Sequence, residues 1–264
     1  MPIKIEKTTK WVSPVIAIFL WEILAILISD PSILPYPLET FKFWYKLAVE
    51  GYMGNTLFQH TTMSLIRVLL GFTMASIIAI PMGIIMGWIR YAESALGTII
   101  ETLRPIPPLA WIPLVLLWFG GTSILSQAII IFIGAFFPIL LNTISGVKST
   151  PKILVEAAYT LGTNEKELVR KVVIPSSLPY VITGLRIGLG IGWMCLVAAE
   201  FMGVKNGLGL GAMMIFFHGA GIPEGIIVGM LMIGIIGLIM NEIVIFVEKR
   251  TLVWREEVGL RLGV

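Results

Sequence analysis

Side chains that could carry catalytic or metal chemistry are few in this chain. It holds two histidines, His60 and His218, and one cysteine, Cys195, which lies inside an apolar run and resembles a small buried hydrophobe. A transition-metal site needs three or four such ligands together. No serine with histidine and no pair of acids lies within an apolar run, and no G-x-x-x-x-G-K-[ST] nucleotide-binding motif occurs. The sequence therefore predicts no catalytic residue, no metal site and no cofactor in this chain.

The stretch with the most distinctive chemistry is a charged island between two apolar runs. It contains Glu156-Ala157-Ala158, then Gly162, then Val172-Val173-Ile174-Pro175. A carboxylate on an exposed helix can pair with a basic residue of a partner protein, and neighbouring alanines keep that side of the helix small. An ordered, charged island of this kind predicts a contact with a soluble partner.

Helix start and stop signals divide the island into two short helices. Thr150 is predicted to cap the first helix, and Gly162 to form the left-handed turn that ends it. Asn164 is predicted to cap the second helix, with Glu167 three residues later as in a capping box. The second helix is predicted to stop at Pro175, because proline lacks the backbone N–H. The expected product is a compact knob of two helices joined at a glycine.

The surrounding composition predicts a membrane protein built from helices. Hydrophobic residues make up 57% of the 264 residues and charged residues 13%, against about 25% charged in soluble domains. Runs of about 20 apolar residues are long enough to cross ~30 Å of hydrocarbon. The predicted fold class is an all-α polytopic membrane protein with about six transmembrane helices, at residues 12–30, 61–89, 94–119, 122–146, 177–203 and 225–247.

The basic residues predict the orientation of these spans. With the N-terminus inside, most lysines and arginines outside the spans fall in cytoplasmic segments, whereas Lys42, Lys46 and Lys205 fall in external ones. This bias follows the positive-inside rule. It predicts a multi-pass protein of the cell (cytoplasmic) membrane with both termini and the charged island in the cytoplasm. Membrane topology then explains the net charge of +3 without any binding of nucleic acid.

Three segments carry simpler structural signals. Residues 38–51 are predicted to form an amphipathic helix at the outer membrane interface. The glycine-rich residues 203–223 are predicted to form a tight re-entrant or surface turn that receives a docking partner. The second span is predicted to pack closely against another helix, because small residues recur every four positions in it, at Gly71, Ala75, Ala79, Gly83 and Gly87.

The third predicted span cannot be an undisturbed helix. Its sequence from Leu103 to Leu114 is LRPIPPLAWIPL, and each proline removes a backbone donor. Broken backbone at membrane depth is tolerated where it is buried in protein or lines a water-filled cavity. The segment is therefore predicted to lie on a substrate pathway, and the candidate residues are Arg104, Pro105, Pro107, Pro108 and Trp111. The alternative for Arg104 is that it snorkels or pairs with Glu101 one turn earlier.

Further polar residues within the spans are candidates for the pathway or its gates. Pro138 is predicted to kink the fourth span, and Asn142 to hydrogen-bond to a neighbouring helix. Arg186 either snorkels at the inner surface or belongs to an inner gate. Glu200 either lines an external vestibule or pairs with Arg67, which the predicted topology places at a similar depth, and pairing is the favoured prediction.

The charged island resembles the EAA loop of the membrane subunits of ATP-binding-cassette (ABC) importers. The pattern of that loop is E-A-A, three residues, G, nine residues and I-x-L-P; here Val172 replaces the isoleucine and Ile174 the leucine. The proline-rich run in the third span, together with Trp118-Phe119-Gly120, is similar to the nitrate, sulfonate, taurine and bicarbonate importer permeases. The resemblance extends from about Thr61 to Gly211.

This resemblance implies a type I ABC importer permease-like (MetI-like) fold. It implies a single permease domain over residues 1–264, with the first span and the external amphipathic segment in 1–60 and the core permease in 61–247. The coupling loop would be residues 148–175 and the cytoplasmic tail 248–264. The residues that the resemblance implies for ATPase coupling are Glu156, Ala157, Ala158, Gly162, Val172, Ile174 and Pro175.

The resemblance also implies a set of partners. Two ATPase subunits, which would hold ATP and Mg²⁺, would bind the knob, and an external binding protein would deliver a small solute, with an anion favoured. A second permease copy, identical or a close paralogue, and membrane lipid would complete the assembly. The alternative is an ion-gradient-driven secondary transporter or channel. That alternative would explain the broken third span and Arg104, but it would not explain the ordered island.

Overall fold

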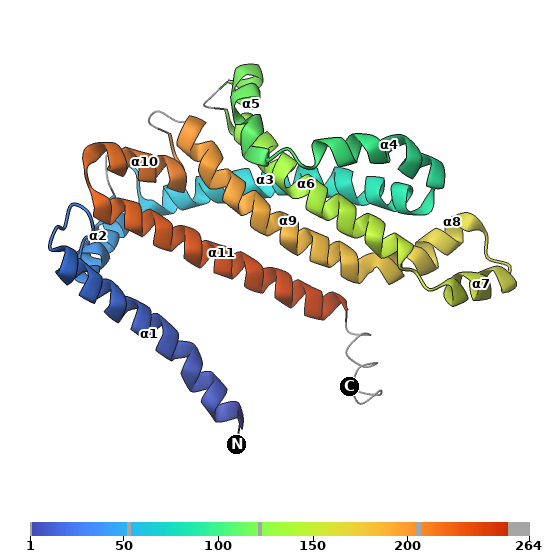
Figure 1. Cartoon of the computed structure of the whole chain (residues 1–264), viewed down its shortest axis with the longest axis horizontal. Coiled ribbons are helices and arrows are strands. Elements are labelled where there is room, and N and C mark those ends of the chain that lie inside the picture. Colours follow the sequence, from blue (N-terminus) through green and yellow to red (C-terminus); the bar gives the residue numbers. More distant parts are fainter. Residues whose placement is uncertain (1, 52–53, 121–122, 204–206, 253–264) are drawn as a thin grey trace. The chain divides into compact units, whose positions relative to one another are not determined.

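The protein is described by a computed structural model that covers residues 2–51, 54–120, 123–203 and 207–252. Every regular element in this part of the chain is a helix, as the predicted all-α fold class requires. The elements are α1 (Pro2–Ile28), α2 (Pro37–Val49), α3 (Leu57–Trp88), α4 (Arg90–Leu103), η1 (Pro108–Trp111), α5 (Ile112–Phe119), α6 (Ile124–Lys148), α7 (Lys152–Thr160), α8 (Glu165–Leu168), η2 (Val169–Val173), α9 (Ile174–Gly203), α10 (Leu210–Ala220) and α11 (Pro223–Thr251) (Figure 1).

Length and apolarity qualify four helices as membrane spans within the described residues. They are Leu57–Trp88, Ile124–Lys148, Glu165–Phe201 and Pro223–Thr251, which correspond to the second, fourth, fifth and sixth predicted spans. The third predicted span is a pair of helices bent by 84°, and it makes a fifth span if the pair crosses as one. The described apolar part of the first predicted span, Val12–Ile28, is shorter than the 18 residues of a candidate span.

The described chain divides into two compact units. The first unit is Met1–Ser64 with Val204–Gly234, and the second is Leu65–Gly203 with Ile235–Val264. Both α3 and α11 contribute residues to each unit.

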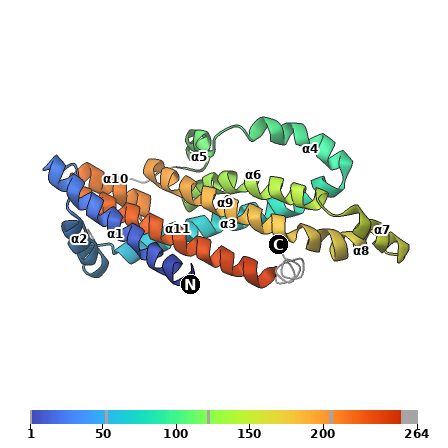
Figure 2. The same ribbon diagram turned by 60° about the horizontal axis from the view of Figure 1, so that its bottom comes forward.

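Close helix packing builds the second unit. A Cβ atom added at Gly83 would lie 2.6 Å from Cβ of Thr143, and one added at Gly71 would lie 2.7 Å from Cβ of Ile131. The predicted small-residue stripe of α3 therefore does pack against another helix, which is α6. On the other side of α6, Gly188 of α9 lies against Ile139 in the same way. Figures 1 and 2 show α9 lying along α6.

In the first unit, α10 is a correction to the sequence analysis. We predicted a glycine-rich turn over residues 203–223, but Leu210–Ala220 is an apolar helix. Tertiary packing explains the difference, because Gly225 of α11 leaves room for the ring of Phe217. The Phe217 ring also meets Phe43 of α2 edge to face at 5.5 Å. α2 itself covers Pro37–Val49, close to the amphipathic helix predicted at 38–51.

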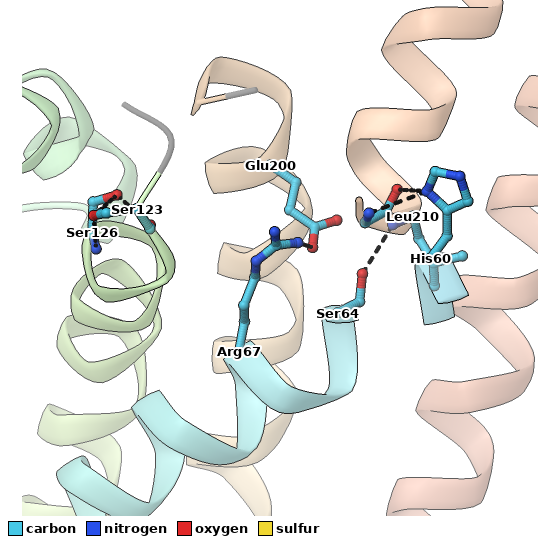
Figure 3. A network of polar contacts seen from close by, with 8 residues as sticks. His60, Ser64, Arg67, Ser123, Ser126, Glu200 and Leu210 are labelled. Carbon is cyan, nitrogen blue, oxygen red and sulfur yellow. Dashed lines mark hydrogen bonds and ion pairs between the residues drawn. The ribbon is translucent and has the colours of Figure 1, made fainter. Parts of the chain in front are cut away.

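Side chains of α3 satisfy the N-terminus of α10. The backbone N–H of Leu210 donates to Oγ of Ser64 at 2.9 Å, and Nδ1 of His60 lies 3.1 Å from the backbone N and 3.0 Å from the carbonyl oxygen of Gly209 (Figure 3). These bonds matter because the first N–H groups of a helix have no partner within it. His60 thus has a structural contact that the sequence analysis did not foresee.

Candidate functional site

The turn between α7 and α8 forms where the sequence predicted it. Gly162 has a φ of +79°, in the left-handed region that favours glycine. The side chain of Asn164 then accepts a hydrogen bond from the N–H of Glu167 at 2.9 Å, which confirms the predicted cap. The predicted cap at Thr150 is wrong, because α7 begins one residue later with Pro151 at its N-cap and no side-chain bond there. α7 and α8 are called the α7–α8 knob below.

Four buried apolar residues anchor the α7–α8 knob. Ala158, Leu168 and Val173 form a cluster with Val147, which lies at the end of α6. Ile84 and Trp88 at the end of α3 pack against this cluster. The knob is therefore fixed to the ends of two long helices rather than being a loose loop between them.

The opposite side of α7 is exposed and mixes apolar and acidic groups. Glu156 and Ala157 are exposed as predicted, whereas Ala158 is buried in the anchoring cluster. The sequence analysis missed the apolar members of this surface: 70% of Ile153 and 85% of Leu161 are exposed. Their spacing was the available signal, since residues three to four apart share a helical face: Ala157 is four positions after Ile153, and Leu161, the C-cap residue of α7, is four positions after Ala157. We call Ile153, Glu156, Ala157 and Leu161 the coupling surface.

Pro175 does not stop the helix, which corrects the sequence prediction. Val169–Val173 is a π-helical turn, in which the N–H of Ile174 donates to the carbonyl of Val169 five residues back. The wider turn changes the bonding register just before Pro175, so its missing N–H falls in the first turn of α9, where it is tolerated. One continuous helix of 37 residues, Glu165–Phe201, therefore leads from the knob into α9. Val172 is half-buried against the anchoring cluster, and Ile174 is half-buried in the same stretch.

The proline-rich run breaks the third predicted span as expected. α4 ends at Leu103, Pro105 and Pro107 lie between the helices, and Pro108 begins the short helix η1. Trp111 packs on a cluster formed by Ile112 and other residues of α5, α6 and α9, and its indole Nε1 is buried without a hydrogen-bond partner.

Arg104 lies at the C-terminal end of α4 with an exposed side chain. The described residues include no ion pair between Arg104 and Glu101, so the predicted alternative of an intrahelical pair is wrong. Snorkelling of Arg104 and its place on the pathway both stay predictions.

Within the described part of the chain, Asn142 hydrogen-bonds inside its own helix and not to a neighbouring one. Its amide Nδ2 donates to the carbonyl of Pro138, four residues earlier in α6, at 2.8 Å. The reason is close packing: a Cβ added at Gly184 of α9 would lie 2.8 Å from Cβ of Asn142, so the helices meet there by van der Waals contact. Pro138 lies within α6, and the predicted kink there stays a prediction.

Arg186 is part of a polar group between α9 and α11 in the second unit. Its Nε donates to Oδ1 of Asn241 at 3.1 Å, and its Nη1 lies 4.0 Å from Oε2 of Glu248. These residues border a cavity whose other lining is mainly apolar and includes Leu189 and Trp193. Arg186 was a predicted site residue, whereas its partner Asn241 was not, because the two residues lie 55 positions apart.

Glu200 pairs with Arg67, as the sequence analysis favoured. Nη1 of Arg67 lies 2.6 Å from Oε1 of Glu200, and the two side chains are only 5% and 0% exposed (Figure 3). The pair joins α3 to α9 across 133 positions of sequence. Two charges at this distance stabilise each other strongly only because each lacks water to screen it.

The fold is that of an importer permease. A solved structure of the MetNI methionine ABC transporter in an inward-facing conformation matches 78% of this chain and 97% of its own chain, with a TM-score of 0.62 and 18% identity. At this identity the likeness shows the fold alone, and it confirms the MetI-like architecture predicted from the resemblance.

The chain belongs to the family of the binding-protein-dependent transport system inner membrane component, whose family model matches residues 79–252. An ABC transporter permease protein of Methanocaldococcus jannaschii is 46% identical, over 92% of this chain and 90% of its own. The taurine transport system permease protein of Escherichia coli is 34% identical, over 90% and 86%. The nitrate import permease protein of Synechocystis is 30% identical, over 94% and 92%. The chain is thus a membrane-spanning permease of the ABC importer class. This finding favours the predicted importer permease over the alternative of a gradient-driven transporter.

Proposed function

We propose that this permease forms the translocation pathway for a small anion, which an external binding protein delivers and which ATP hydrolysis on a partner subunit drives across the membrane. Two ATPase subunits would hold ATP and Mg²⁺ and bind the α7–α8 knob. A second permease copy, identical or closely related, would complete the pathway. The knob and both termini would face the cytoplasm.

The coupling surface is the observation that carries this proposal. Ile153 and Leu161 are large apolar side chains that remain exposed on a knob whose other side is firmly anchored. Exposed apolar groups beside a carboxylate suit a protein partner, because apolar area provides affinity and the charge selects orientation. A partner that binds there can transmit force through the continuous helix Glu165–Phe201.

The proposed substrate class is supported by the names of relatives and by two cations. One relative is named for taurine transport and another for nitrate import; nitrate is an oxyanion, and taurine carries an anionic sulfonate group. Arg104 lies at the break of the third predicted span, and Arg186 lies beside a cavity. A guanidinium is the side chain best suited to planar anions, since it offers several donors in a fixed geometry. Uptake of labelled taurine, nitrate and bicarbonate by cells that carry the complete transporter would test the class.

Movement of the knob would open and close the pathway. We propose that it tilts α6 and α9 about Pro138, Pro175 and Pro179. Two conformations are required, and ATP and loaded binding protein can shift their populations only by binding them with different affinities.

Capture of the ATPase subunit by the purified permease tests the proposed docking. Glu156→Lys reverses the charge of the coupling surface, and Leu161→Glu introduces a charge into its apolar part; each should weaken capture at least tenfold. The matched control is Glu39→Lys, which makes the same charge change at an exposed position of α2. Loss of capture in the two variants but not in the control supports the proposal. Equal capture by all four proteins would mean that the ATPase docks elsewhere, and no capture by the wild type would contradict the function itself.

A further inference from the structure

Helix register places Gln127 at about the same height in the helix bundle as the buried Arg67–Glu200 pair. Gly71 of α3 lies against Ala128 and Ile131 of α6, and Arg67 is one turn before Gly71. Gln127 is likewise one turn before Ile131 and lies on the same face of α6. Since Gly83 meets Thr143 and Gly71 meets Ile131, the two helices run parallel, which sets Arg67 and Gln127 within about one turn of each other.

The packing of α9 against α6 places Glu200 at the same height along α6 as Gln127. Gly192 meets Ile131, and Gly188 meets Ile139, so α9 runs antiparallel to α6. Eight residues beyond Gly192, Glu200 therefore lies within about one turn of Gln127. Because Ile131 contacts both Gly71 and Gly192, this face of α6 is directed at the seam between α3 and α9.

Gln127 is buried without the bonds that its amide requires. It has 0% exposure, and neither Nε2 nor Oε1 has a hydrogen-bond partner among the residues that the structure describes. A buried amide without partners is costly, and a leucine of similar size would avoid that cost at this position. Simple packing thus gives no reason for a glutamine here.

We infer that Gln127 is a positioning residue of the transport cycle. In the conformation described here Arg67 binds Glu200. The Gln127 amide lies at about the same height in the helix bundle, and among the described residues it makes no hydrogen bond. When α9 shifts relative to α3, the pair lengthens, and the amide donates through Nε2 to Glu200 and accepts through Oε1 from Arg67, so that each buried charge keeps a partner. The amide thereby lowers the free energy of the second conformation relative to the first. This inference rests on the proposed function, since α9 moves only if the knob is driven.

Gln127→Leu separates this role from a structural one. The variant removes two unsatisfied buried atoms from the conformation described here, so its Tm should rise by ~2–4 °C. The second conformation would lose its amide, so the ATPase rate of the reconstituted complex should fall at least tenfold. Gln127→Asn keeps an amide one methylene shorter and should restore a substantial part of the rate.

Spin labels report the movement without any transported solute. Leu69→Cys on α3 and Met194→Cys on α9 are both exposed sites, and Cys195→Ala removes the native thiol. In the complex with its ATPase subunit, trapping with ATP, Mg²⁺ and vanadate should shift the label-to-label distance. With Gln127→Leu the distance should stay at its ATP-free value.

The outcomes distinguish this inference from the proposed function. A Gln127→Leu protein that is more stable, slower in hydrolysis and fixed in distance supports the inference. A variant that hydrolyses ATP and shifts like the wild type would overturn it, and so would a fall in Tm, which would mean that the amide is already bonded in this conformation. A wild type that captures no ATPase subunit would instead overturn the proposed function.

Discussion

The two ends of the helix Glu165–Phe201 lie in opposite environments. At its start the α7–α8 knob exposes Glu156 and Leu161, while only the inner side of the knob is packed. Near its other end Glu200 is fully buried and paired with Arg67. A charge at the exposed end is solvated and free to meet a partner protein, whereas the charge at the buried end is shielded from water and paired with an opposite charge inside the protein. The same residue type is therefore solvated at one end of this segment and part of an internal ion pair at the other.

Breaking the buried pair should have the largest effect on stability. Glu200→Leu leaves the Arg67 guanidinium buried without its counter-charge, which should destabilise the fold by about 3–5 kcal/mol. Thermal unfolding of the purified protein in detergent, followed by circular dichroism, measures the change. Replacing both partners, as Arg67→Met with Glu200→Leu, should recover most of the loss because no lone charge remains.

The matched control is the exposed pair between Lys148 and Glu93. Its side chains are 46% and 41% exposed, so water already screens the two charges. Glu93→Leu should therefore change stability by no more than about 1 kcal/mol. If Glu93→Leu and Glu200→Leu had equal effects, burial would not explain the difference between the two pairs.

The helix packing near the buried Arg67–Glu200 pair should tolerate little added side-chain volume. Gly71→Ala places a methyl group 2.7 Å from Cβ of Ile131, so α3 and α6 must move apart, at about 1–3 kcal/mol. Gly97→Ala in α4 is the matched control, because its added methyl meets nothing within 4 Å. That variant should be neutral or more stable by up to about 1 kcal/mol, as alanine favours helix over glycine. The same unfolding measurement tests both, and a stabilised Gly71→Ala protein would contradict the close packing.

Features set by neighbours in the chain were the ones the sequence revealed. The turn at Gly162 and the cap at Asn164 depend on residues within a few positions, so residue type and spacing were sufficient. The EAA-type spacing predicts a coupling role for the knob in the same way, and that role stays a prediction. The Arg67–Glu200 pair is a long-range contact, and it was found only because the predicted topology put both charges at one depth in the membrane, where a charge needs a partner.

Features set by packing between distant segments were missed. Pro175 was expected to end a helix, but the π-helical turn at Val169–Val173 places it where its missing N–H does no harm. α10 was expected to be a turn, and its contact with Gly225 cannot be read from local composition. No role was predicted for Gln127, because an amide in an apolar run is unusual only once its burial and its neighbours are known.

At the exposed α7–α8 knob, a substitution of Gly162 should have the smallest and most local effect on stability. At Gly162 an added Cβ would meet nothing within 4 Å, so a substitution there changes only the backbone, which has a φ of +79°. Gly162→Val should cost about 1–2 kcal/mol, because a β-branched residue disfavours the left-handed region. Gly162→Asn should retain most of the wild-type stability, since asparagine enters that region more readily.

The strain in Gly162→Val should shift α7, so this variant should lose ATPase capture and transport while substrate binding by the external protein is unaffected. Hydrogen exchange over residues 152–168 measures the local change. If valine left both exchange and capture as in the wild type, the left-handed turn would not be what orients the coupling surface.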